Sequence, residues 1–88
     1  MDHKTLEKIV KGFSNHRRIQ ILAHLDKNPN KTLFQISEDL GVNFKTIGEH
    51  TKRLAAAGLI EKKYKGSAVL HNPTKLGELV LKFLRTLE

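Results

Sequence analysis

Residues 33–59 read LFQISEDLGVNFKTIGEHTKRLAAAGL, and this stretch decides the fold. Its first part carries apolar residues at spacings of three and four, typical of one helix face: Leu33, Ile36 and Leu40. Gly41 then ends this helix, because glycine tolerates the left-handed backbone that turns a chain sharply. Asn43 follows where an N-cap side chain accepts an amide hydrogen bond from a second helix. The stretch therefore predicts two short helices joined by a glycine turn.

The second helix repeats apolar or small residues at helical spacing: Ile47, Thr51, Leu54 and Gly58. Thr51 is polar, and a buried hydroxyl at this position is expected to bond back to the preceding turn. A helix, a tight turn and a capped helix make up the helix-turn-helix pattern, whose second helix is shaped to enter a DNA major groove. We expect the motif to span residues 33–58.

Helices are also predicted on both sides of this motif. A first helix is expected over residues 3–13, and a second from a cap at Ser14 or Asn15 to Lys27, where Asn28-Pro29-Asn30 ends it. The residues expected to face inward from that second helix are Ile19, Leu22, Ala23 and Leu25. Residues 59–72 form two short runs around Lys65-Gly66-Ser67 and predict a β-hairpin, and residues 73–87 predict a last helix.

Length and composition narrow the class of protein. Eighty-eight residues predict a single domain over 1–88, and a chain this short buries only about 60% of its unfolded surface. The net charge of +7 favours an anionic partner, and residues 41–65 hold +4 of it, from six basic and two acidic residues. The polar N-terminus does not resemble a signal peptide, and no apolar run approaches the ~20 residues of a membrane span. We therefore expect a cytoplasmic protein that does not act at a membrane.

The predicted order is four helices, a hairpin and a last helix. This is the order of a mainly α winged helix-turn-helix with a small β-hairpin wing. Two segments carry a more specific resemblance. HRRIQILAHL (16–25) resembles the helix before the motif in ArsR-type regulators, and ISEDLGVNFKTIGEHTKRLAAAGLIEKK (36–63) resembles their motif and its exit into the wing. The resemblance implies a homodimeric transcriptional repressor of bacteria or archaea. It does not extend to the family's metal-sensing residues, since the chain has no cysteine and the last helix has no histidine.

We expect the exposed side of the second motif helix to contact DNA. The residues expected there are Asn43, Phe44, Lys45, Thr46, Gly48, Glu49, Lys52 and Arg53. Lys45 suits a guanine edge and Glu49 a cytosine amino group, whereas Thr46 and Lys52 suit phosphate oxygens. The alternative is a solvated helix face held by an ion pair between Glu49 and Arg53 at i, i+4.

Further basic residues are expected to reach the DNA backbone. In the wing these are Lys62, Lys63 and Lys65, and at the start of the second helix they are Arg17 and Arg18. Alternation along a strand sends Lys62 and Lys63 to opposite sides, so the three wing lysines cannot all touch DNA. The alternative for the wing is an ordinary solvated hairpin.

Two apolar stripes are expected to join two copies of the chain. They lie on the first and last helices and comprise Leu6, Ile9, Val10, Phe13, Leu76, Leu79, Val80, Phe83, Leu84 and Leu87, with Leu81 off the stripe. The alternative is that the last helix packs on the domain's own core. A two-fold dimer would set two recognition helices about one DNA turn, roughly 34 Å, apart, so the expected target is duplex DNA with an inverted repeat.

The sequence favours a sequence-specific DNA-binding regulator and not an enzyme. It has no nucleophile elbow, no glycine-rich phosphate loop and no paired carboxylates, and its five histidines show no helical metal-site spacing. No cofactor and no metal are expected. Two alternatives remain: a winged helix that serves protein–protein interaction without specific DNA binding, and a nonspecific RNA or nucleic-acid coat.

Overall fold

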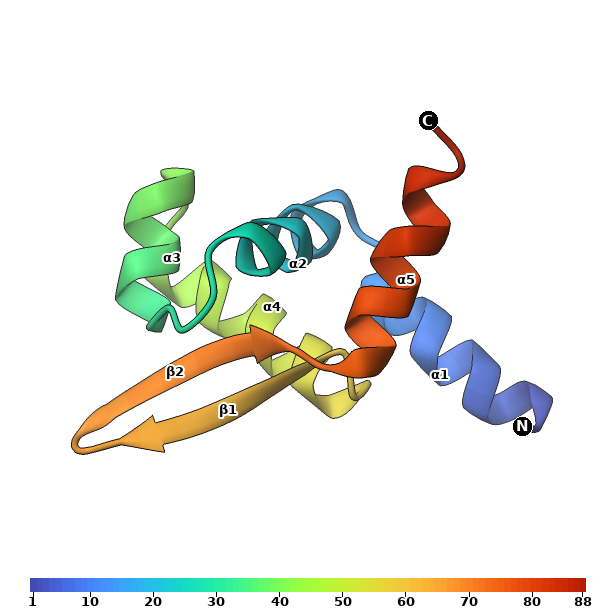
Figure 1. The fold of residues 1–88 in the computed structure, drawn as a ribbon, viewed down its shortest axis with the longest axis horizontal. Coiled ribbons are helices and arrows are strands. Elements are labelled where there is room, and N and C mark those ends of the chain that lie inside the picture. The colour runs from blue at the N-terminus through green and yellow to red at the C-terminus, as the bar shows by residue number, and fades with distance from the viewer.

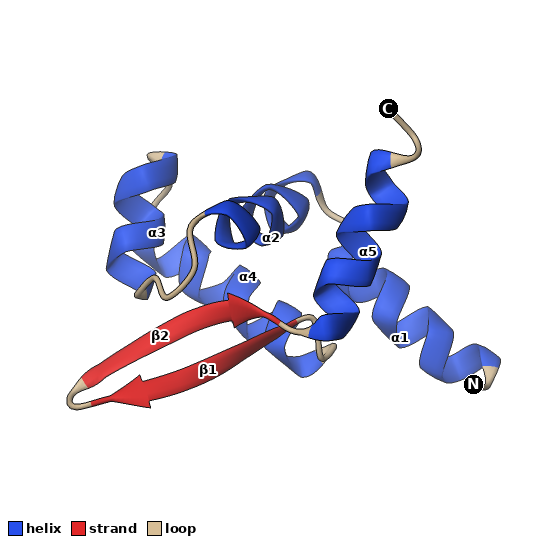
Figure 2. Ribbon diagram, in the orientation of Figure 1, coloured by secondary structure: helices blue, strands red, loops and turns tan.

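The computed structural model describes residues 1–88 as five helices and one antiparallel hairpin (Figures 1 and 2). Two helices come first: α1 (His3–Phe13) and α2 (His16–Lys27). Asn15 separates them and caps α2, since its Oδ1 accepts hydrogen bonds from the amides of Arg17 and Arg18 at 2.9 and 3.1 Å. These bonds satisfy amides that the first turn of a helix leaves without a partner. The predicted bounds of both helices are confirmed.

The helix-turn-helix motif consists of α3 (Leu33–Leu40) and α4 (Phe44–Ala56). Thr32 and Gln35 form a reciprocal capping box at the start of α3. Gly41 ends α3 with φ of 64°, in the left-handed region, and Asn43 caps α4 through its Oδ1. The predicted glycine turn between the two helices is confirmed. It is short because Gly41 ends α3 in the left-handed conformation and Asn43, two residues later, already caps α4.

The wing is the hairpin of β1 (Ile60–Lys65) and β2 (Ala68–Pro73), and Gly66 turns it with φ of 61°. His71 of β2 also bridges to Lys31, in the loop before α3. Asn30 and Asn72 strengthen this attachment, since the side-chain amide of Asn72 exchanges two hydrogen bonds of 2.8 Å with Asn30. The base of the wing is thus fastened to the loop that leads into the helix-turn-helix motif.

The last helix, α5 (Lys75–Arg85), follows a cap at Thr74 and returns to the core. Figure 1 shows α2 near the middle of the molecule, with α3 and the wing tip at one end and α1, α5 and both termini at the other. One apolar core joins α2, α3, α4, the start of β1 and α5, and Ile9 and Phe13 of α1 pack against it. The core residues are Ile21, Leu22, Leu25, Ile36, Ile47, Leu54, Leu59, Ile60, Val80 and Leu81.

The structure corrects the predicted phase of two helices. In α2, Ile21 is fully buried, whereas Ile19, which was expected to face inward, is only half-buried. In α5, Val80, which was expected on the stripe that faces a second copy, is buried in the chain's own core beside Leu81. Both helices carry more apolar residues than one face holds, so spacing alone leaves their rotation open. The expectation for Thr51 is confirmed, since its buried hydroxyl donates to the carbonyl of Gly48 at 3.0 Å.

Candidate nucleic-acid interface

The side of α4 that faces away from the core is polar and mainly basic. Ile47, Thr51 and Leu54 are buried on the inner side. At about 100° per residue the opposite side carries Lys45, Glu49, Lys52, Arg53 and Ala56, and all five are exposed. The predicted candidate residues on this helix face are thus available to a partner.

Some polar groups at the start of α4 are already engaged in contacts within the fold. The Oδ1 atom of Asn43 accepts from the amides of Lys45 and Thr46 at 2.8 and 3.3 Å, so it is occupied by capping. Thr46 is half-buried, whereas Phe44 is 53% exposed. Phe44 is therefore the most accessible apolar group at this end of the helix.

Gly48 is not required by the packing of α4. A Cβ atom at this position would meet only Leu33 Cδ1, at 3.9 Å, which is ordinary van der Waals contact. Glycine inside a helix costs about 1 kcal/mol relative to alanine. The fold therefore gives no reason for the glycine, although a partner that approaches the backbone closely would.

Glu49 and Arg53 form no ion pair, although they are spaced i, i+4. The alternative interpretation, a solvated helix face stabilised by a Glu49–Arg53 ion pair, therefore lacks the contact on which it depends. Together with Lys52 and Ala56, these two side chains line a hollow of about 380 Å³ on the outer side of α4. Their charged groups are open to solvent and to a partner.

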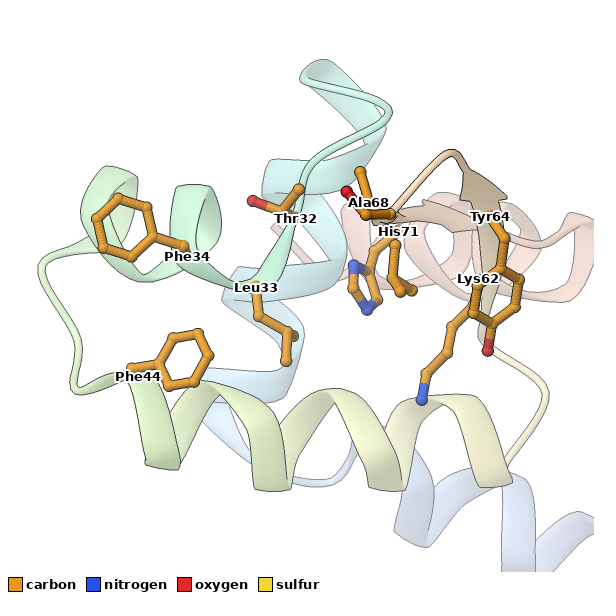
Figure 3. A pocket seen from close by; sticks show the side chains of 10 residues that line it. Thr32, Leu33, Phe34, Phe44, Lys62, Tyr64, Ala68 and His71 are labelled. Atoms are coloured by element: carbon orange, nitrogen blue, oxygen red, sulfur yellow. The ribbon is translucent and has the colours of Figure 1, made fainter.

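Between the wing and the helix-turn-helix motif lies a groove of about 400 Å³ (Figure 3). Phe34 and Phe44 lie at one end, and Lys62 and Tyr64 at the other, with Leu33 between them. Lys63 and Lys65 do not line this groove, in keeping with strand alternation. Lys62 therefore faces α4, and the other two wing lysines are exposed elsewhere on the hairpin.

The sequence did not single out two of the groove's aromatic residues. Phe34 and Tyr64 are 63% and 73% exposed. Phe34 lies on the outer side of α3, opposite the buried Ile36. An aromatic residue on this otherwise polar helix face was the feature of the sequence that could have identified Phe34. For Tyr64 the signal was its two-residue offset from Lys62, which places both on one side of the strand.

The side chains of Arg17 and Arg18 differ in their contacts with the rest of the fold. Arg17 donates to its own helix, to the Gln20 side chain at 2.6 Å. Arg18 is held by α1 and α4, because its guanidinium donates to the Lys11 carbonyl at 3.1 Å and lies 3.5 Å from His50 Nδ1. The structure thus gives Arg18 a clamping role between three helices.

The fold lowers the pKa of two histidines, His50 and His71. Burial, followed by the charges of Arg18 and Arg17, lowers the pKa of His50. Burial also lowers the pKa of His71, and the nearby Lys62 acts in the same direction, although the hydrogen bond to the Lys31 carbonyl opposes them. His71 Nδ1 lies 2.8 Å from that carbonyl oxygen, so this ring nitrogen carries the proton and donates the hydrogen bond.

A similar contact fastens α2 to α3. Asp39 Oδ2 lies 2.9 Å from His24 Nε2 and 3.2 Å from Lys31 Nζ. Hydrogen bonds from His24 and then Lys31 lower the pKa of Asp39. These contacts tie α3 to α2 and to the loop before it, and α4 follows α3 after one short turn.

The apolar residues expected at a dimer interface divide into three groups by burial. Exposed are Leu6, Val10, Leu79, Phe83 and Leu87. Partly buried against the chain's own core are Ile9, Phe13, Leu76 and Leu84. Val80 is only 8% exposed, so it serves this core and offers little to a second copy. The stripe available on α5 therefore consists of Leu79 and Phe83, with Leu87 just beyond the end of the helix.

No group of three or more metal-ligating side chains gathers anywhere in the structure. None of the five helices combines the length and apolar content that a membrane crossing requires.

Comparison with known proteins identifies the motif and the architecture. The family model described as winged helix-turn-helix DNA-binding matches residues 14–61. No curated protein matches the chain. Among solved structures, the homodimeric winged helix-turn-helix domain of Mb0332 from Mycobacterium bovis, a possible ArsR-family regulator, has a TM-score of 0.87 and 20% identity, over 96% of this chain and 78% of that one.

Two further solved structures share the fold. An ArsR-like transcriptional regulator from Rhodococcus sp. RHA1 has a TM-score of 0.78 and 25% identity, over 97% of this chain and 77% of that one. FabT from Streptococcus pneumoniae, in complex with DNA, has a TM-score of 0.73 and 20% identity, over 93% of this chain and 64% of that one. The similarities extend over almost the whole chain, beyond the part that the family model matches.

Proposed function

This chain belongs to the winged helix-turn-helix DNA-binding family, and from that premise we propose that it is a homodimeric transcriptional repressor that reads a specific duplex DNA sequence. The observation that carries the proposal is the outer face of α4. This face is exposed and mainly basic, its helix begins at a side-chain cap on Asn43, and a wing with three lysines stands beside it.

Base readout is assigned to the first half of α4. Lys45 matches the O6 and N7 acceptors of guanine, and Glu49 accepts from the amino group of cytosine. Phe44 has no polar group to offer a base edge, but its exposed ring suits the methyl group of thymine. Asn43 and Thr46 contribute through the geometry of the helix start, since capping occupies the Asn43 oxygen.

Backbone contacts are assigned to the wing and to the later part of α4. Lys63 and Lys65 are exposed on the hairpin, and Lys52 and Arg53 are exposed on α4. Such contacts add affinity and fix the position of the protein without reading sequence. Lys62 faces α4 across the groove, so its ammonium group adds to the positive potential between wing and helix.

Dimerisation is assigned to the exposed apolar residues of α1 and of the C-terminal segment. Leu6 and Val10 are exposed on α1, Leu79 and Phe83 on α5, and Leu87 just after it. Figure 1 shows α1 and α5 at the end of the molecule away from the wing tip. A similar fold from Mycobacterium bovis is described as homodimeric, which supports pairing of two copies. A two-fold pair gives two recognition helices about 34 Å apart, and therefore an inverted-repeat target.

Repression of transcription is the simplest role for a protein whose surfaces serve DNA contact and dimerisation. DNA contact and dimerisation account for the surfaces of α1, α4, α5 and the wing, and a bound dimer can occupy a promoter and exclude the transcription machinery. The protein then acts where the chromosome lies, in the cytoplasm of a bacterium or archaeon.

A substitution on α4 tests the proposal. Lys45→Ala with Lys52→Ala should weaken binding to a preferred duplex by about 1–3 kcal/mol through loss of the Lys45 base contact, and further through loss of the Lys52 phosphate contact. Binding by the unchanged chain should weaken steeply with salt. Fluorescence anisotropy would measure this, with Lys27→Ala plus Lys82→Ala as a control of equal charge, since both of these lysines are exposed and lie off α4. Equal affinity of the two double variants would remove α4 from the interface.

The groove beside the wing favours a second candidate, a protein-interaction module. Three aromatic side chains, Phe34, Phe44 and Tyr64, are exposed around it, and exposed apolar patches mark interaction sites. An interaction module predicts a shallow salt dependence and no protection of DNA from cleavage.

A further inference from the structure

The basic surface of α4 continues onto α1. A hollow of about 160 Å³ lies between these helices, lined by Lys8, Lys11, Gly12, Arg53, Ala56 and Ala57. Two of these residues, Arg53 and Ala56, also line the larger hollow on the outer side of α4. The outer face of α4 and one side of α1 therefore form one continuous surface.

Close packing of the two helices creates this surface. A Cβ atom at Gly12 would lie 2.3 Å from the Cβ of Ala57, so only glycine lets α1 approach the end of α4 this closely. Arg18 adds a tie, since its Nη2 donates to the Lys11 carbonyl at 3.1 Å. The positions of Lys8 and Lys11 beside Arg53 are therefore fixed by the fold.

Positive charge dominates the junction. Lys8, Lys11 and Arg53 are cationic and exposed, and Lys4 continues the row one turn earlier on α1. The acidic neighbour on α1 is Glu7, 3.9 Å from Lys11, in a pair whose two side chains are largely exposed. An exposed pair of this kind is weak and is screened by salt, so it does not prevent Lys11 from meeting another anion.

We propose that Lys8 and Lys11 of α1 contact backbone phosphates of the bound DNA, beside the recognition helix and on the side away from the wing tip. Figure 1 shows α1 and the wing tip at opposite ends of the molecule. The cations of α4 thus lie between two other cationic segments, and the DNA is held on both sides of the recognition helix. Lysine reaches phosphate as a flexible point charge, so these contacts add affinity and no sequence preference.

The inference rests on the proposed function, and it adds a location on the DNA. If α1 and α5 join the two copies, α1 lies between the two recognition helices. The phosphates that Lys8 and Lys11 meet then belong to the stretch between the two half-sites, whereas the wing meets phosphates outside them.

The test compares salt dependence in matched charge variants. Anisotropy titrations with a mixed-sequence duplex of about 30 base pairs, about three helical turns, would be run from about 50 to 200 mM salt. The proteins are the unchanged chain, Lys8→Gln with Lys11→Gln, and the control Lys27→Gln with Lys82→Gln. Both double variants remove the same charge at exposed positions, and sedimentation would check that both keep the same oligomeric state.

In the α1 variant, the slope of log affinity against log salt should fall by roughly 0.9 for each phosphate that is no longer neutralised, with a several-fold weakening of affinity. The slope should hardly change in the control. Equal slopes for the two variants would overturn the inference while leaving the proposed function intact. Weakening confined to a preferred duplex, with none on the mixed-sequence one, would also overturn it, because that pattern indicates base contact. No binding by the unchanged chain would refute the proposed function itself.

Discussion

Gly48 separates the needs of the fold from those of DNA binding. Its neighbourhood has room for a methyl group, so Gly48→Ala should stabilise the protein by about 0.5–1 kcal/mol through better helix propensity. The same methyl group would stand between the helix backbone and a closely approaching DNA, so affinity should fall. Urea unfolding and DNA titration on the same variant would measure the two effects. Greater stability with unchanged affinity would show that the glycine has no role in DNA contact.

His71 should make stability depend on pH. Burial keeps its folded-state pKa below the ordinary value of about 6.5, so the unfolded chain takes up a proton before the folded chain does. The unfolded state therefore binds more protons as pH falls below about 6.5, and the free energy of unfolding decreases until pH reaches the folded-state pKa.

Urea unfolding at about pH 7.5 and about pH 5.5 tests this expectation. The unchanged chain should lose stability at the lower pH, and His71→Gln should lose less than the unchanged chain, although it starts from a lower value. An unaltered pH response in His71→Gln would assign the effect to other groups.

At the scale of the elements, α5 depends on a close approach to the start of the wing. A Cβ atom at Gly77 would lie 2.1 Å from the carbonyl oxygen of Leu59, which is backbone and cannot turn aside. Gly77→Ala should therefore destabilise the protein by about 1–3 kcal/mol, although the same change at Gly48 should stabilise it. Thermal or urea unfolding of the two variants makes a matched comparison, and equal effects at the two positions would contradict it.

The elements that sequence predicts well are those with local signals. Gly41, Asn15 and Asn43 act within a few residues of their own positions, and the structure confirms the turn and both caps. The rotation of α5 is different, because its leucines and valine occupy more than one face. Only the contact with the rest of the core selects Val80 and Leu81 as the buried pair.

Contacts between segments far apart in the chain could not be predicted from the periodicity of the sequence. The bridge from Lys31 to His71 joins residues 40 positions apart, and the clamp of Arg18 onto Lys11 and His50 joins three helices. Such pairs leave no periodic signal. For the same reason the sequence did not point to Lys8 and Lys11, whose proposed role depends on α1 lying beside α4.

For the whole molecule, the exposed side of α5 should control assembly. Leu79→Glu with Phe83→Glu places charges on the stripe expected to meet a second copy, and both residues are exposed within one chain. The double variant should stay folded and become monomeric, with weaker binding to DNA that contains two half-sites. Sedimentation and circular dichroism would measure assembly and folding.

Val80→Ala serves as the comparison for that experiment. Val80 is buried in the chain's own core, so its truncation should lower stability by roughly 1–3 kcal/mol and leave assembly unchanged for the folded protein. If the charged α5 variant remained a dimer, the proposed interface on α1 and α5 would be wrong.

The central claim is that two copies of α4 read duplex DNA together, and selection of bound sequences from random duplexes at about 150 mM salt tests it most directly. The account predicts an inverted repeat whose half-sites lie about ten base pairs apart, centre to centre. Recovery of no common sequence, at a concentration where the protein is dimeric, would contradict it and favour the protein-interaction module.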